Sequence, residues 1–280
     1  MQGKPSSVGK KTGATLFSNV GVRPMAELHR FLIEKVALQA LSDKELSILL
    51  GGGKLLNELN FSTKQLWFYK NTFLASEEGP DKKAAFAGLS FFLRILAGHV
   101  FEAYEYFRRE VRVDKLKTEY NITDENFYTD IKVLKKYFAS KNIISGMRNR
   151  FSFHTDSELM RRSFVRLPHE FAYEALLGKY RGHNIFCGSE TIIIDGLQHL
   201  AGNTSWEDAI NLAFEDATRN AVLLSSVVQR VIGSIMTTRL NLTMSSAERV
   251  SLSDGPPIDD VRVPFFCQPP RVRVDPSDSG

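Results

Sequence analysis

The chain has little cysteine and lacks the common metal-binding and nucleotide-binding motifs. Its two cysteines, Cys187 and Cys267, form no CxxC pair and no Cys/His cluster. Neither a zinc site nor a disulfide framework is therefore indicated, and a reduced, cytoplasmic setting fits best. A P-loop is excluded because the glycine triplet 51–53 is followed by Lys54 and then Leu55, where a P-loop has Ser or Thr. We expect no metal and no cofactor.

The chain also lacks an uninterrupted apolar run of bilayer length. Its longest apolar tracts, near Phe91 and Val222, are broken by Arg94 and Arg230 within a bilayer's span. The first residues have no apolar signal core. The sequence therefore predicts no membrane partner.

What the chain does contain is the composition of an ordinary globular protein. Hydrophobic residues make up 43% of it and charged residues 24%. The net charge of +4 is small and spread along the chain, so it permits a polyanionic partner such as RNA without requiring one.

Apolar residues recur with a helical period along most of the chain. We expect a helix after Pro24, a capped helix from Ser42 that the glycine triplet 51–53 interrupts or ends, and a further capped helix from Ser62. A break is expected at residues 78–81, Glu-Gly-Pro-Asp.

The second part of the chain continues the pattern. A very apolar helix is predicted from Lys82 to about Arg112, and an amphipathic helix opened by Thr123. Helix is also expected from residue 169 through Leu176, followed by a loop around residues 182–188. A long helix is predicted from a capping box at 204–207 to about Leu240.

These patterns predict an all-α, multi-helix bundle with flexible tails at both ends. The expected organisation is a disordered N-terminal tail over 1–22, a helical domain over 23–244 and a Pro-rich extended tail over 245–280.

Residues 143–156 bring polar chemistry to the margin of a buried helix. Arg148, Asn149 and His154 lie beside an apolar stripe with i, i+3 and i+7 spacing. That stripe consists of Ile144, Met147 and Phe151.

An arginine with a polar neighbour, followed by a histidine after residues 149–153, resembles the signature of HEPN domains. Arg23–His29, Arg94–His99 and Arg162–His169 have a similar gap, but only Arg148 has both the polar neighbour and the Phe-Ser-Phe lead-in. The resemblance implies a helical, toxin-like hydrolase that cleaves RNA without a metal. His154 would handle the proton of the 2′-hydroxyl, Arg148 would stabilise the phosphate and Asn149 would orient the site.

Geometry adds a condition to this prediction. On a straight helix, Arg148 and His154 would be roughly 120° apart around the axis and about 9 Å apart along it. Either the helix is distorted before His154, or two subunits combine their motifs. The resemblance implies composite sites at a two-fold interface, so we expect a homodimer.

Other charged residues are expected to support the site. Arg150, Arg161 and Arg162 are candidates for binding a nucleic-acid backbone, with exposed salt bridges as the alternative. Arg94, His99 and Glu102 lie on the very apolar helix, where charges must pair, reach water or line a cleft. We expect them to surround the catalytic residues, and an internal Arg–Glu pair is the alternative.

Two further functions stay open. The chain is either an enzyme or a catalytically inactive helical module that binds protein or nucleic acid, with Arg148 paired to a carboxylate such as Glu102. A small-ligand sensor is the third reading, with Arg94 and His99 lining an internal pocket. An antitoxin or another protein partner is left open.

Overall fold

The computed structural model describes residues 28–152, 156–179, 181–250 and 255–267. The described chain is an all-α helical bundle, which confirms the predicted fold class. Its main helices are α1 (Lys35–Leu38), α2 (Asp43–Ala75), α3 (Pro80–Glu110), α4 (Leu116–Tyr120), α5 (Glu125–Phe138), α6 (Ile143–Met147), α7 (Ser157–Arg166), α8 (Cys187–Leu200) and α9 (Trp206–Leu240). Short 3-10 helices are η1 (Val113–Lys115), η3 (Arg181–His183), η4 (Met244–Ser246) and η5 (Ile258–Asp260), and η2 (Arg148–Ser152) is a π-helix.

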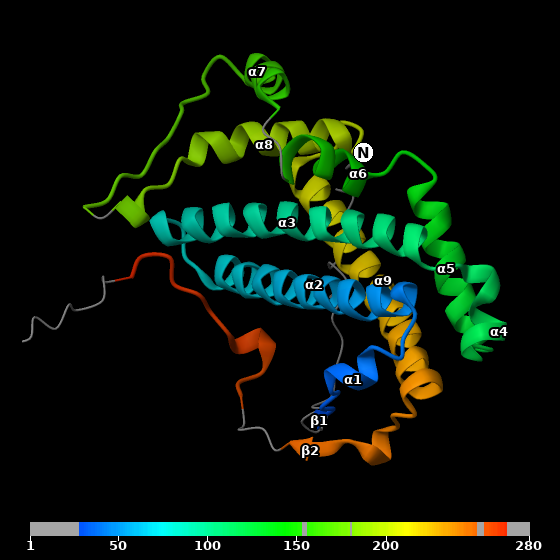
Figure 1. Cartoon of the computed structure of the whole chain (residues 1–280). Helices are drawn as coiled ribbons and strands as arrows, with labels where there is room; N and C mark the ends of the chain where they lie inside the picture. Colours follow the sequence, from blue (N-terminus) through cyan, green and yellow to red (C-terminus); the bar gives the residue numbers. More distant parts are fainter. Residues whose placement is uncertain (1–27, 153–155, 180, 251–254, 268–280) are drawn as a thin grey trace, which may run out of the picture.

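Three long helices form the centre of the bundle. The antiparallel pair α2 and α3 lie side by side, and α9 crosses both (Figure 1). On α9 an alanine recurs every fourth residue on the buried face, which lets the neighbouring backbones approach closely. These buried alanines are Ala209, Ala213, Ala217 and Ala221.

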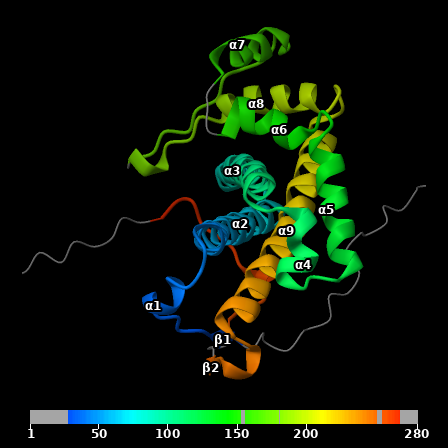
Figure 2. The same ribbon diagram turned by 45° about the vertical axis from the view of Figure 1, so that its right-hand side comes forward.

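Helix α3 lies between two layers. Figure 2 shows α2 on one side of α3, with α6 and α8 on the other. Helix α7 packs on α8, and α5 packs on α9. Charged groups of α3 that point toward α6, η2 and α8 therefore face partners from the second half of the chain.

Local capping signals are confirmed at several helix ends. Ser42 and Glu45 form the predicted capping box of α2. Gly79 has a φ of 154°, which suits glycine, and Pro80 opens α3, so the predicted break is present. Helices α5 and α9 are capped by Asp124 and Ser205, one residue after the threonines expected to open them.

The predicted interruption at the glycine triplet and the predicted helix start at Ser62 are both wrong, because α2 is one continuous helix. The Ser62 hydroxyl donates to the Glu58 carbonyl, 2.5 Å away, and so does not cap a new helix. A Cβ on Gly51 would lie 2.2 Å from the Tyr106 hydroxyl oxygen of α3. The glycine therefore allows a close helix contact and does not end the helix.

Two further helix predictions are wrong. Residues Leu28–Arg30 form strand β1, which pairs antiparallel with β2 (Glu248–Val250) and leaves only the short α1 after it. The helix expected from residue 169 through Leu176 is instead irregular, and Leu176 forms an isolated bridge with Ile185. The loop expected around residues 182–188 gives way to α8 at Cys187. At β1 a pairing with a distant segment overrides the local helical pattern, whereas the bridge partner of Leu176 lies only nine residues further along the chain.

Part of the predicted C-terminal tail lies against α2 as an extended strap of residues 255–267 (red in Figure 1). The Asn71 side-chain amide donates to the Ile258 carbonyl at 2.9 Å, and the Thr72 hydroxyl accepts from the Val263 amide at 3.0 Å. The predicted N-terminal tail, 1–22, lies outside the described residues.

Helices α3 and α9 are each long and apolar enough to cross a membrane by length and composition. The core helices of a folded bundle pass the same test, and 50% of the apolar window of α3 is buried inside the protein. The expected absence of a membrane partner stays a prediction.

Candidate functional site

The predicted catalytic arginine is held by a carboxylate of α3. Nε and Nη2 of Arg148 donate to Oε1 of Glu102 at 2.9 and 2.7 Å. Nη1 donates to the side-chain oxygen of Asn149 at 3.1 Å, and the guanidinium lies 5.2 Å from the ring centre of Phe101. The Arg148 side chain is 30% exposed and that of Glu102 44%, so the pair reaches solvent.

The backbone that carries Arg148 is a π-helix. Helix α6 begins at the cap Asn142 and passes at Arg148 into η2. The Ser152 hydroxyl donates to the Arg94 carbonyl of α3 at 2.6 Å, while Phe151 is buried. Such π-turns are frequent at functional sites because they redirect side chains that a regular helix would hold in register.

The spacing of Arg148 and His154 required either a distortion of the helix before His154 or motifs from two subunits. The π-helix η2 is a distortion of this kind. The histidine itself, at position 154, lies outside the described residues.

The residues expected to surround the motif divide into three groups. Glu102 contacts Arg148 directly, whereas the Arg94 side chain pairs with Glu190 of α8 at 3.2 Å. His99 faces α2, where its Nδ1 lies 3.4 Å from the Ser62 hydroxyl. Burial lowers the pKa of His99 below its ordinary value of 6.5. An internal Arg–Glu pair, the alternative considered from sequence, is present between Arg94 of α3 and Glu190 of α8.

The expected basic cluster is exposed and internally paired. Arg161 and Arg162 both donate to the Glu158 carboxylate, at 3.0 and 2.8 Å, and these hydrogen bonds lower the Glu158 pKa to about 2. Arg150 lies half-buried on η2. The side chains of Arg161 and Arg162 are 65% and 67% exposed, so a phosphate backbone can reach them only in competition with Glu158.

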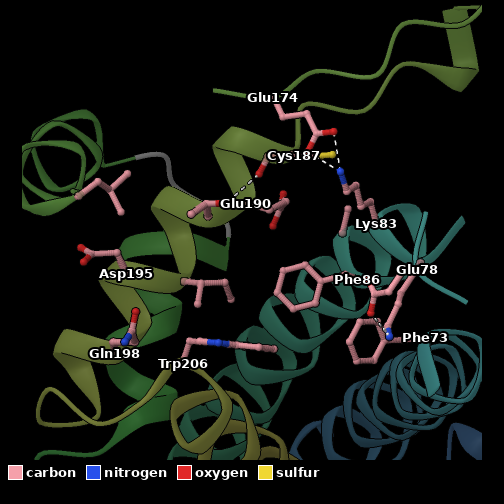
Figure 3. A pocket seen from close by; sticks show the side chains of 15 residues that line it. Phe73, Glu78, Lys83, Phe86, Glu174, Cys187, Glu190, Asp195, Gln198 and Trp206 are labelled. Carbon is pink, nitrogen blue, oxygen red and sulfur yellow. Dashed lines mark hydrogen bonds and ion pairs between the residues drawn. The ribbon is translucent and has the colours of Figure 1, made fainter. Parts of the chain in front are cut away.

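The ligand-sensor hypothesis expected an internal pocket lined by both Arg94 and His99, and no pocket described here has both. A void beside Arg94 has a volume of about 10 Å³, which is no more than one water molecule needs, and His99 does not line it. A larger pocket of about 470 Å³ lies between the start of α3 and α8 (Figure 3). Its residues were missed from sequence because they come from elements that are far apart in the chain.

Within the described residues, no group of three or more His, Cys, Asp or Glu side chains is arranged to hold a metal ion. Cys187 is half-buried and Cys267 exposed, and neither forms a disulfide. Burial raises the pKa of the Cys187 thiol, which favours its neutral form.

Neither a protein-family model, nor a curated protein, nor a solved structure matches this chain. The likeness to HEPN domains therefore depends on the Arg148–Asn149–His154 motif and its helical setting.

Proposed function

We propose that this protein is a metal-independent endoribonuclease of HEPN type, in which Arg148 binds the scissile phosphate and His154 handles the proton of the 2′-hydroxyl. The observation that supports this most is the setting of Arg148. Its guanidinium reaches solvent from a π-helix, held by Glu102, shortly before the histidine in the chain.

The hydrogen bonds of Arg148 leave donors for a phosphate. Nε is used by Glu102, but each terminal nitrogen carries a second N–H beyond the one given to Glu102 or Asn149. A planar guanidinium fixed on one edge can present its other edge to two phosphate oxygens. Glu102 then acts as a positioning residue that holds the Arg148 guanidinium in a fixed orientation before RNA binds.

The second candidate is a catalytically inactive helical module that binds RNA or protein. Its support is that Glu102 already neutralises Arg148, and Glu158 does the same for Arg161 and Arg162. A module needs only an accessible surface, whereas the enzyme also needs His154 to reach the same phosphate.

Cleavage of structured and unstructured RNA in EDTA separates the two functions. We expect cleavage by the wild type and a loss of about 100-fold or more in Arg148→Ala and His154→Ala. Matched controls are Arg230→Ala, which removes an exposed arginine paired with Asp124, and His199→Ala, which removes an exposed histidine of α8. Both controls should cleave at the wild-type rate.

The other outcomes are equally clear. If the purified wild type binds RNA or a protein but leaves every RNA intact, the module is correct and the enzyme is rejected. If EDTA abolishes wild-type cleavage, the reaction depends on a metal and the proposed mechanism is wrong.

A further inference from the structure

The pocket between α3 and α8 is of a size that takes a small organic molecule. Its volume of about 470 Å³ lies within the usual range for ligand sites. The end of α2, the first turns of α3, α8 and the first residue of α9 supply its walls. In Figure 3 aromatic rings occupy one side, with Glu174, Cys187 and Glu190 on the other.

The aromatic side is a connected cluster of three rings. The centre of the Phe86 ring lies 5.7 Å from that of Phe73 and 6.0 Å from that of Trp206. The ammonium of Lys82 lies 5.5 Å from the centre of the Phe73 ring, so this wall already attracts a cation of the chain itself. A flat apolar group or an organic cation is the kind of ligand that such a wall accepts.

The charged side chains that line the pocket include more acidic than basic groups. Four carboxylates and two ammonium groups line it, which gives the lining alone a formal charge of −2, and two arginines outside the lining offset that charge. The acidic groups are Glu78, Glu174, Glu190 and Asp195, and the ammonium groups are Lys82 and Lys83.

Both lysines are already engaged by carboxylates of the same pocket. Lys82 pairs with Glu78 at 2.5 Å, and Lys83 pairs with Glu174 at 2.6 Å. A ligand of either charge would compete with one member of these pairs, so they do not select the sign of its charge.

The counter-ions of the remaining two carboxylates lie outside the pocket lining. Glu190 accepts from Ser90 at 2.6 Å and pairs with Arg94, and Asp195 pairs with Arg166 at 2.5 Å. The side chains of Glu190 and Asp195 are only 17% and 19% exposed. Because the two arginines lie outside the lining, a ligand in the pocket meets the carboxylate side of each pair first.

We propose that this pocket binds a small organic amine that carries an aromatic ring. The ring packs against Phe86 and Trp206, and the ammonium lies toward Glu190. This site is separate from the Arg148 pair. About 28 Å of helix axis separates Lys83 from Glu102, and about 12 Å separates Arg94, the partner of Glu190, from Glu102, at 1.5 Å per residue. The proposal does not depend on RNA cleavage.

Three probes that share a phenyl ring but differ in charge test the proposal directly. They are phenethylamine, 2-phenylethanol and 3-phenylpropionate. Trp206 fluorescence reports binding in a Trp67→Phe background, because Trp67 and Trp206 are the two tryptophans of the chain. We expect saturable binding of the amine, about three- to tenfold tighter than the alcohol, and weaker binding of the carboxylate.

Two variants show whether the probes occupy the pocket. Thr191→Phe places a ring on the lining and should abolish amine binding, whereas Thr129→Phe, on the exposed surface of α5, should not change it. Glu190→Gln removes one negative charge from the pocket lining and leaves the positive charge of Arg94 without its partner. The affinity for phenethylamine should therefore fall, and the affinity for 3-phenylpropionate should rise. A purely structural effect would instead weaken all three probes together.

The proposal is overturned if no probe shows saturable binding, if 3-phenylpropionate binds most tightly, or if Thr191→Phe leaves amine binding intact. Because these titrations contain no RNA, their failure is distinguishable from a failure of the ribonuclease proposal.

Discussion

At the scale of single residues, partly buried charges are paired with partners far away in the sequence. Each pair joins two elements, and in the least exposed of them, Arg94–Glu190, each group offsets the cost of burying the other's charge. These pairs are Arg94–Glu190, Arg148–Glu102 and Arg239–Glu45. Their main effect is to specify which helices lie together, because the net stability gained from such a pair is small.

His99 gives a residue-scale prediction about pH. Its folded-state pKa lies below 6.5 because burial disfavours the charged ring, so the unfolded chain binds more protons near that pH. The contribution to stability is therefore fully present above about pH 6.5 and falls as pH drops through 6.5 toward the lower folded-state pKa. Urea unfolding of the wild type between about pH 5 and 8 should show this decline.

The matched variants for this prediction are His99→Gln and His199→Gln. The first should flatten the pH dependence over that interval, while the second, which alters an exposed position of α8, should retain the wild-type slope. A His99→Gln protein with an unchanged slope would show that another group is responsible.

At the scale of elements, the contact between α2 and α3 depends on glycine at position 51, where a Cβ would meet the Tyr106 side chain. The Tyr106 hydroxyl lies over Gly51 and donates to the Ser47 carbonyl at 2.6 Å. Two residues further on, a Cβ added to Gly53 would meet no atom within 4 Å. The same residue type thus has a packing role at one position and none at the other.

This difference predicts opposite effects of the same substitution. Gly51→Ala should lower the free energy of unfolding by roughly 1–3 kcal/mol, because the new methyl group displaces the Tyr106 ring. Gly53→Ala should raise it by about 0.5–1 kcal/mol through the greater helix propensity of alanine. Chemical denaturation measures both, and equal effects would contradict the close contact at Gly51.

At the scale of the whole molecule, the proposed ribonuclease raises the question of whether one chain forms a complete site. The π-helix provides the distortion that would let one chain bring Arg148 and His154 together, whereas a homodimer would combine the motifs of two chains. The two arrangements make different predictions for mixtures of inactive variants.

The composite site is tested by unfolding the Arg148→Ala and His154→Ala variants, mixing them in equal amounts and refolding them together. If each site takes its arginine from one chain and its histidine from the other, about one quarter of wild-type cleavage should return, because half of the dimers carry one intact site. Light scattering on the same samples gives the mass of the particle. No recovery from a confirmed mixed dimer would place each site within one chain.

The sequence by itself determined the features that depend on neighbours within one helical turn. These include the capping box at Ser42, the break at Gly79–Pro80, the amphipathic helix α5 and the requirement that charges on α3 find partners. Hydrogen bonding and side-chain spacing between i and i+4 are local, so they can be predicted from composition and period.

Only the tertiary structure decided which distant groups meet. Helix α2 continues through residues 51–53, and Leu28–Arg30 form a strand because they pair with Glu248–Val250. Arg94 forms its ion pair with Glu190 of α8. The tertiary structure also assembled the pocket of Figure 3 from four helices and the segment that precedes α8. The physical reason is that burial and ion pairing stabilise contacts between segments that are far apart in the sequence. The residues next to either segment carry no pattern that identifies its partner.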